Sequence, residues 1–159
     1  MRPGGVRALA IGGTFAVALG ACSNGETTGN GERSPEDTGT PAAEATVATS
    51  DSDLGTIVVD AQGRTLYVFL ADEGSESTCY DECEDNWPPL TVSGDPVAGE
   101  GIDASLLSTS ERTDGSSQVT LDGHPLYVFA AETVAGDTNG QGIGDVWFVV
   151  SPSGKAIKG

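Results

Sequence analysis

The sequence predicts an all-β fold, and three observations favour this class. Runs of β-branched and aromatic residues alternate with turn residues such as Gly and Asp along residues 56–157. One apolar run occurs twice, as LYVFLAD in residues 66–72 and as LYVFAAE in residues 126–132. Only Ala104–Ser108 is a helix candidate, and it is about one turn long. We therefore expect two related β-hairpin repeats and a C-terminal hairpin, packed as a small sandwich or a barrel-like sheet.

Each expected hairpin has a turn signal between its strands. The strands are expected at residues 56–60 and 65–70, at 118–121 and 126–130, and at 146–150 and 155–157. The tetrapeptide AQGR separates the first pair of strands. Asp122-Gly123, a strong signal for a two-residue turn, separates the second pair. Ser151–Gly154 separates the third pair.

The repeated strand is apolar on both faces. In an extended chain, Tyr67 and Phe69 face one side, whereas Leu66, Val68 and Leu70 face the other. A strand that is apolar on both sides is typical of a central position with cover on each face. The same arrangement is expected for the second copy of the run.

The first 22 residues predict a secretion signal with a lipid-attachment site. Arg2 and Arg7 precede an apolar run, which at about 11 residues is too short for a bilayer core that needs about 20. The tetrapeptide LGAC then places small residues before Cys22. We expect cleavage before Cys22 and attachment of lipid to it, so that the protein is held at the extracytoplasmic face of the cell membrane.

Three segments follow from these patterns. Residues 1–21 are expected to be a lipoprotein signal peptide, residues 22–52 the lipidated cysteine and a disordered linker, and residues 53–159 the all-β domain. The linker is rich in Gly, Ser, Thr and Glu and has no aromatic residue. Such a composition buries too little apolar surface to offset the entropy of ordering the chain.

The charge balance excludes one class of partner. The chain has 24 Asp and Glu against seven Lys and Arg, and its formal net charge is −17. A polyanion of this density is not expected to bind nucleic acid, whose phosphates repel it. Lipid chains rather than electrostatic attraction are therefore expected to hold the protein at the membrane.

Two cysteines remain when Cys22 carries lipid. Cys79 and Cys83 are expected to form a disulfide, because disulfides persist outside the cytoplasm. The alternative is a redox or copper-handling pair, since soft thiolates favour Cu(I). The pair lies within residues 72–85, a stretch with seven carboxylates that is expected to be a solvated loop or a weak Ca²⁺ site.

A second stretch has oxygen donors at alternate positions, as in Ca²⁺-binding loops. The candidate metal ligands are Asp137, Asn139, Gln141 and Asp145. The match is incomplete, because the twelfth position of such a loop requires Glu and is Phe148 in this chain. A Gly-rich turn is therefore the main interpretation of this stretch.

The repeated run carries a Tyr-x-(Phe/Trp/Tyr)-x-x-Asp motif. Its residues are Tyr67, Phe69 and Asp72 in the first copy and Tyr127, Phe129 and Glu132 in the second, where Glu replaces Asp. With these motifs the chain resembles a family of bacterial secreted-repeat lipoproteins, and the likeness extends over residues 54–154. The resemblance implies a cell-envelope lipoprotein and provides no catalytic residues.

The expected role is therefore a non-enzymatic one, either binding or structural, in the cell envelope. No catalytic residue and no cofactor is expected. The expected partners are the membrane, through the lipid, and either an envelope protein or a cation, while the oligomeric state stays open. The first alternative is a metal-handling module for Ca²⁺ or Cu, or a redox module, and the second is an enzyme of unrecognised type.

Overall fold

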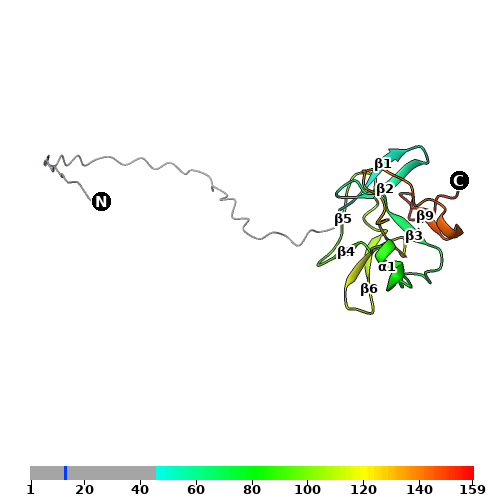
Figure 1. The fold of residues 1–159 in the computed structure, drawn as a ribbon. Helices are drawn as coiled ribbons and strands as arrows, with labels where there is room; N and C mark the ends of the chain where they lie inside the picture. Colours follow the sequence, from blue (N-terminus) through cyan, green and yellow to red (C-terminus); the bar gives the residue numbers. More distant parts are fainter. Residues whose placement is uncertain (1–12, 14–45) are drawn as a thin grey trace, which may run out of the picture. The chain divides into compact units, whose positions relative to one another are not determined.

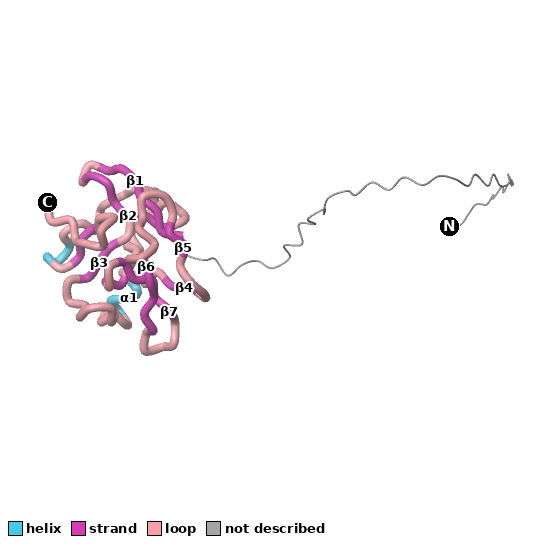
Figure 2. Tube along the Cα trace, turned by 180° about the vertical axis from the view of Figure 1, so that it is seen from behind, coloured by secondary structure: helices cyan, strands magenta, loops and turns pink. Residues whose placement is uncertain are grey.

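The computed structural model describes Gly13 and residues 46–159, and the latter form a β-rich domain (Figures 1 and 2). Its elements are β1 (Thr46–Ser52), β2 (Gly55–Asp60), β3 (Tyr67–Phe69), α1 (Glu82–Asn86), β4 (Thr91–Val92), β5 (Val97–Ala98), β6 (Leu107–Glu111), β7 (Ser117–Leu121), β8 (His124–Pro125), the 3₁₀ helix η1 (Ile143–Asp145) and β9 (Trp147–Val149). The predicted all-β class is confirmed. Cys22 and the rest of the predicted signal and linker up to residue 45, Gly13 apart, lie outside the described residues.

Three small sheets make up this domain. Their strand orders are β2-β1-β5, β3-β9 and β4-β7-β6, with β8 also paired to β7. The contact between β1 and β5 is parallel, and the other strand pairs are antiparallel. Antiparallel pairing suits a chain whose strands are joined mostly by short turns.

The predicted boundary between linker and domain is wrong by seven residues. Residues 46–52 form β1, which pairs with β2 from Val47–Asp60 to Ser52–Gly55. Val47 is fully buried and belongs to the apolar core. The polar composition of this segment concealed the strand, because pairing with the apolar β2 and burial of one valine outweigh a low local propensity.

The three predicted hairpin turns form, but the first has a different partner strand. Val59 and Thr65 make only an isolated bridge across the first turn, while β2 pairs along its length with β1 and β3 pairs with β9. The second hairpin forms as β7-β8, and both residues of its Asp122-Gly123 turn have positive φ. Its return strand is His124–Pro125, however, and the predicted strand at residues 126–130 is wrong, because only isolated bridges at Tyr127 form there. The third is confirmed by the bridge between Val150 and Ala156.

The helix lies elsewhere than predicted. Ala104–Ser108 forms turns, and its last two residues begin β6. The α-helix is Glu82–Asn86, inside the acidic stretch that is predicted to be a solvated loop. The Trp87 N–H donates to the Cys83 carbonyl at the end of this helix. The helix begins within the segment closed by Cys79 and Cys83 and ends at the buried Trp87, whose burial no local signal indicates.

Alternate residues of β3 and the residue before it enter two different apolar clusters. Leu66 and Val68 belong to a cluster rich in Leu and Val. Tyr67 is fully buried in a second cluster that contains Trp87 and Trp147. The predicted cover on both faces of the strand is therefore confirmed, with the exception of Leu70, which is 42% exposed.

The two repeats exchange their last segments. Position n of the first repeat corresponds to n + 60 in the second, as the two LYVF runs show. Strand β3 of the first repeat pairs with β9, which ends the second repeat. The corresponding strand of the second repeat binds residues that end the first, because Val128 N–H donates to the Pro88 carbonyl at 2.9 Å.

The repeats meet at two equivalent tyrosines. Tyr67 and Tyr127 form an antiparallel bridge in which each N–H donates to the carbonyl of the other, at 2.8 and 3.0 Å. This reciprocal pair lies at a local two-fold relation between the repeats. The two repeated LYVF segments therefore find their backbone partners in the other repeat.

Candidate functional site

Four aromatic rings form a continuous stack at the junction of the repeats. Its order is Phe129, Trp87, Trp147 and Phe69, with ring centroids 4.4, 4.0 and 4.3 Å apart. Trp87 and Trp147 are equivalent positions of the two repeats. Each tryptophan stacks on the motif phenylalanine of the other repeat. We call this stack, with the motif tyrosines and acids, the motif centre: Tyr67, Phe69, Asp72, Trp87, Tyr127, Phe129, Glu132 and Trp147.

The two motif tyrosines pack edge-on against the same stack. Tyr67 contacts Trp87 with centroids 5.2 Å apart, and Tyr127 contacts Trp147 at 5.1 Å. Edge-to-face and offset-stacked rings are the favoured aromatic geometries and stabilise a core beyond the burial of area. The equal 60-residue spacing of the tryptophans and of the LYVF runs was a sequence signal for this stack.

The motif tyrosines and acids also bond across the repeats. The Tyr67 hydroxyl donates to the Glu132 carboxylate, and the Tyr127 hydroxyl donates to Asp72 Oδ2 at 2.7 Å. Each repeat thus supplies the acceptor for the tyrosine of the other. The motif requires Tyr and an acid because a buried hydroxyl needs a partner, and a carboxylate is a strong one. The Glu in the second copy keeps this role.

Glycine at position 140 lets the chain close over Tyr67. The Gly140 N–H donates to the Tyr67 hydroxyl oxygen at 3.1 Å. A Cβ atom at position 140 would lie 2.7 Å from Trp87 and 2.8 Å from Tyr67, too close for any other residue. The stretch predicted as a Gly-rich turn or a metal loop therefore covers the motif centre.

Two of the four predicted metal ligands, Asp137 and Gln141, form hydrogen bonds that connect segments of the domain. Gln141 joins two segments, because its Nε2 donates to the Ile157 carbonyl and its Oε1 accepts from the Val149 N–H. The Asp137 carbonyl accepts from the Thr65 hydroxyl, and Asp145 lies in η1 with positive φ. Within residues 46–159 no group of three or more His, Cys, Asp or Glu side chains is arranged to hold a metal ion. Metal binding through Asp137, Asn139 and Asp145 stays a prediction.

Burial controls the ionisation of the motif centre. The pKa values of Tyr67 and Tyr127 are raised far above the ordinary tyrosine value of 10.0, mainly by burial and further by the charges of Glu132 and Asp72. Burial likewise raises the pKa of Glu132, against the lowering effect of its hydrogen bond from Tyr67. The two hydroxyls are thus neutral donors at physiological pH.

Alkaline pH is expected to unfold the domain through these tyrosines. A raised pKa means that the folded state resists ionisation, so this contribution is complete below about pH 10 and is lost as the pH rises above it. The free energy of unfolding should fall by up to about 1.4 kcal/mol per pH unit for each tyrosine. Denaturant titrations between pH 8 and 12 measure this slope. A slope that is unchanged in a Tyr67→Phe/Tyr127→Phe double variant would contradict the assignment.

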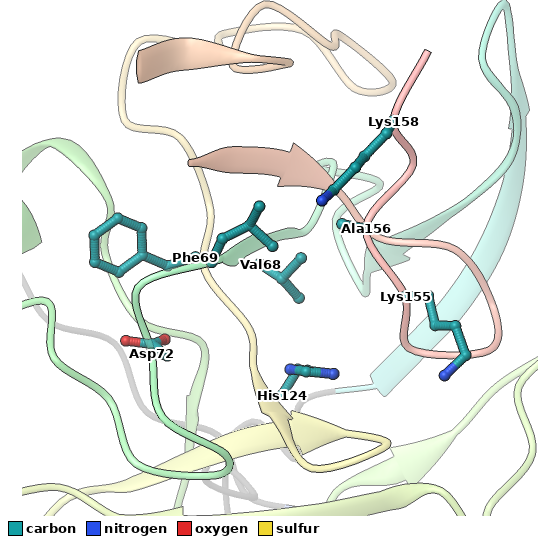
Figure 3. Close-up of a pocket in the computed structure, with 8 residues that line it drawn as sticks. Val68, Phe69, Asp72, His124, Lys155, Ala156 and Lys158 are labelled. Carbon is teal, nitrogen blue, oxygen red and sulfur yellow. The ribbon is translucent and has the colours of Figure 1, made fainter. Parts of the chain in front are cut away.

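A pocket of about 360 Å³ lies beside the motif centre (Figure 3). Its lining residues are Val68, Phe69, Leu70, Asp72, His124, Lys155, Ala156 and Lys158. They come from β3 and the loop after it, from β8 and from the C-terminal hairpin. His124, the only histidine of the chain, has an exposed side chain at the rim of this pocket. The pocket therefore lies between the first motif copy and the C-terminal residues of the chain.

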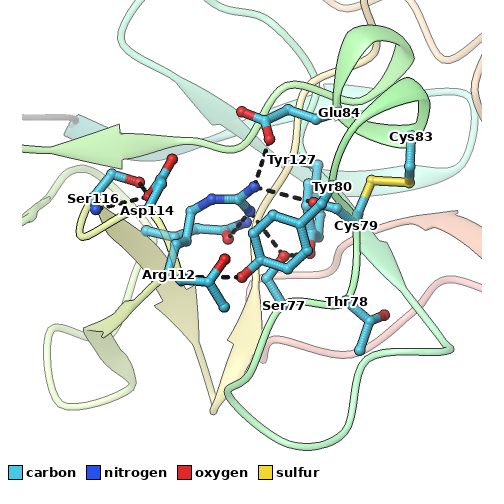
Figure 4. Close-up of polar contacts among 12 residues, drawn as sticks. Ser77, Thr78, Cys79, Tyr80, Cys83, Glu84, Arg112, Asp114, Ser116 and Tyr127 are labelled. Atoms are coloured by element: carbon cyan, nitrogen blue, oxygen red, sulfur yellow. Dashed lines mark hydrogen bonds and ion pairs between the residues drawn. A yellow bond between two sulfur atoms is a disulfide. The ribbon is translucent and has the colours of Figure 1, made fainter.

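A buried arginine holds the disulfide-containing segment in place (Figure 4). The Nη2 atom of Arg112 donates to the Cys79 carbonyl at 3.1 Å and to Glu84 Oε2 at 2.8 Å. Its Nη1 atom donates to Ser77 Oγ at 2.8 Å and to Gln118 Oε1 at 2.9 Å. Arg112 is only 3% exposed. Sequence reasoning missed this residue, because nothing local marks an arginine for burial.

The arginine is linked to the motif centre by one hydroxyl. Ser77 Oγ lies 2.6 Å from the Tyr127 hydroxyl oxygen, which also donates to Asp72. Cys79 and Cys83 lie at disulfide distance, as expected, with Cα atoms 5.2 Å apart. The acidic stretch is thus tied down at Asp72, at the disulfide and at Glu84 rather than being solvated throughout.

Comparison with known proteins identifies both repeats. A family model described as a secreted repeat of unknown function matches residues 48–91 and again residues 108–151. The two matches have the same length and are separated by the 60-residue offset of the exchanged strands. The first match begins at residue 48, within the segment that the sequence alone assigns to the linker, in agreement with β1. The chain has no significant match among curated proteins or solved structures.

Proposed function

Because the chain belongs to the Lipoprotein_15 family of secreted repeats, we propose that it is a lipid-anchored, non-enzymatic module with a binding or structural role in the cell envelope. The family description places it outside the cytoplasm and assigns no activity.

One observation carries the non-enzymatic role. The polar groups of the family motif form hydrogen bonds with one another, since the Tyr67 hydroxyl donates to Glu132 and the Tyr127 hydroxyl donates to Asp72. A catalytic acid, base or nucleophile needs a face that is open to substrate and a pKa close to the working pH. Both tyrosines are fully buried and their pKa values are far too high for that use. The motif therefore serves to join two repeats.

Attachment through lipid is supported by the N-terminal sequence. The apolar run before LGAC is too short to remain as a spanning helix. Among the residues that the structure describes, none belongs to a helix long and apolar enough to cross a bilayer. Two or more acyl chains on Cys22 are sufficient for stable anchoring, because each buried CH₂ contributes about 0.8 kcal/mol.

The Cys22→Ser variant is expected to leave the membrane fraction. Without its thiol the chain cannot accept a thioether-linked lipid, so the protein should appear in the soluble extracytoplasmic fraction. Membrane fractionation after a high-salt wash, followed by immunoblotting, measures the distribution. A Cys79→Ser/Cys83→Ser variant is the matched control, because it removes the other two thiols and should stay with the membranes. Retention of Cys22→Ser in the washed membranes would refute the anchor.

A further inference from the structure

We propose that the pocket beside β3 binds a small organic anion, a carboxylate on an apolar body. This deepens the binding role proposed above by naming a ligand class, and it rests on that role. The pocket itself is independent of the anchor. A titration therefore tests it separately from membrane fractionation.

The floor of the pocket is apolar. Val68, Phe69 and Ala156 line it, and Leu70 adds a side chain that is 42% exposed. Leu70 departs from the burial that its position in the repeat predicts. A volume of about 360 Å³ is at the lower end of the range of about 300–1,000 Å³ that small-molecule pockets occupy. These residues offer an apolar ligand of one or two rings a surface to cover.

The rim of the pocket concentrates the cationic side chains of a strongly acidic domain. Residues 46–159 contain 19 Asp and Glu but only four Lys and Arg. Arg64 is paired with Asp60, and Arg112 is buried against Glu84. The remaining two, Lys155 and Lys158, both line the pocket, together with His124. In such an acidic domain this rim is the place where an anion meets positive charge at short range.

The two lysines make only weak interactions with other side chains of the domain. Lys155 Nζ lies 3.2 Å from Asp122 Oδ2 in an exposed pair, and exposed pairs contribute little free energy. Lys158 Nζ lies 5.7 Å from the centroid of the Phe148 ring, an interaction that is also weak at exposed sites. Both ammonium groups are therefore available to a ligand.

Asp72 gives the pocket a direction. Its oxygens accept from Thr78 and from the Tyr127 hydroxyl, so its negative charge is held in place. Figure 3 shows Asp72 on one side of the pocket and Lys155 and Lys158 on the other, with Val68 between them. A carboxylate is thus expected at the lysine end, with its apolar body along Val68 towards Phe69.

Titration with 1-naphthoate tests the proposal. The full chain carrying Cys22→Ser, which avoids detergent, is followed by backbone NMR at positions 124 and 155–158. We expect saturable shifts at these positions and weaker binding at high salt, because charge attraction is screened. The neutral isostere 1-naphthamide should bind at least about fivefold more weakly, equivalent to about 1 kcal/mol. Inorganic phosphate, which has no apolar body, should also bind more weakly than 1-naphthoate.

Variants of the two lysines locate the site. Lys155→Gln and Lys158→Gln should each weaken 1-naphthoate binding about two- to fivefold, and the double variant about tenfold. Lys158→Arg should retain binding. Ser93→Asp, at an exposed position outside the lining, changes the net charge by the same amount as Lys158→Gln and should leave the affinity unchanged.

Three results would overturn the proposal. The first is the absence of saturable shifts at the pocket. The second is equal affinity for 1-naphthoate and 1-naphthamide, which would show that the negative charge of the ligand does not contribute to binding. The third is equal affinity for 1-naphthoate and phosphate, which would show that the apolar body does not contribute. Loss of binding in Ser93→Asp as large as in Lys158→Gln would indicate a general charge effect and would also overturn it.

Discussion

A chain that is cut between its two repeats should not fold as separate halves. We expect fragments 1–94 and 95–159, cut at the exposed Gly94-Asp95 bond, to lack cooperative unfolding when each is alone. An equimolar mixture should regain the fold. Each fragment contains a repeated strand whose partner segment lies in the other, since β3 pairs with β9 and Val128 bonds Pro88.

The loss of stabilising free energy in each fragment is expected to exceed the total stability of a small domain. Native domains are stable by about 5–15 kcal/mol, and the cut separates Trp87 from Trp147 and Tyr67 from Glu132 at once. Near-UV circular dichroism during thermal unfolding measures the outcome. A Trp147→Ala change in fragment 95–159 should abolish recovery on mixing. Cooperative melting of either fragment alone, at a midpoint near that of the intact chain, would contradict the exchanged architecture.

The Trp147→Ala variant should lose about 3–5 kcal/mol of unfolding free energy. Trp147 is 5% exposed and packs against three rings at once. It stacks on Trp87 and Phe69 and meets Tyr127 edge-on. Its removal leaves a cavity in the middle of the stack and ends the contact between the repeats there. Urea denaturation monitored by near-UV circular dichroism measures the change.

The neighbouring Phe148→Ala variant is the matched control for this experiment. Phe148 belongs to the same strand but points to the opposite face, where it is half-buried beneath Lys158. The Phe148→Ala substitution also removes one aromatic ring, but the Phe148 ring is not part of the stack. We expect less than half the loss seen in Trp147→Ala. Equal losses in the two variants would show that the stack has no special share in stability.

Much of the fold followed from local signals. The turn at Asp122-Gly123 was predictable, because that dipeptide accepts the positive φ that both residues adopt. The cover on both faces of β3 was predictable because the run at residues 66–70 is apolar on both of its faces. The strand at residues 46–52 was not, because only its pairing with β2 and the burial of Val47 distinguish it from a linker.

The candidate sites divide in the same way. The motif residues were identified from the repeated run and the family resemblance, and the cysteine pair from the number of cysteines. Their roles were not, because the acceptor for Tyr67 is 65 residues away. Arg112 carried no sequence signal, since its importance comes from the Cys79 carbonyl and Glu84 that surround it. Gly140 lies in the predicted Gly-rich turn, but its close approach to Trp87 was visible only in the structure.

The amino-acid sequence by itself determined a β-rich protein with two related units, because runs of apolar residues and turn dipeptides are local patterns. Only the tertiary structure decided which unit completes which. Trp87 and Trp147 are equivalent in sequence, as are Tyr67 and Tyr127. Contacts within one repeat would therefore bring together the same kinds of side chain as contacts between the two repeats. The path of the chain in three dimensions selects the exchange, in which both tyrosines find an acid and both tryptophans stack.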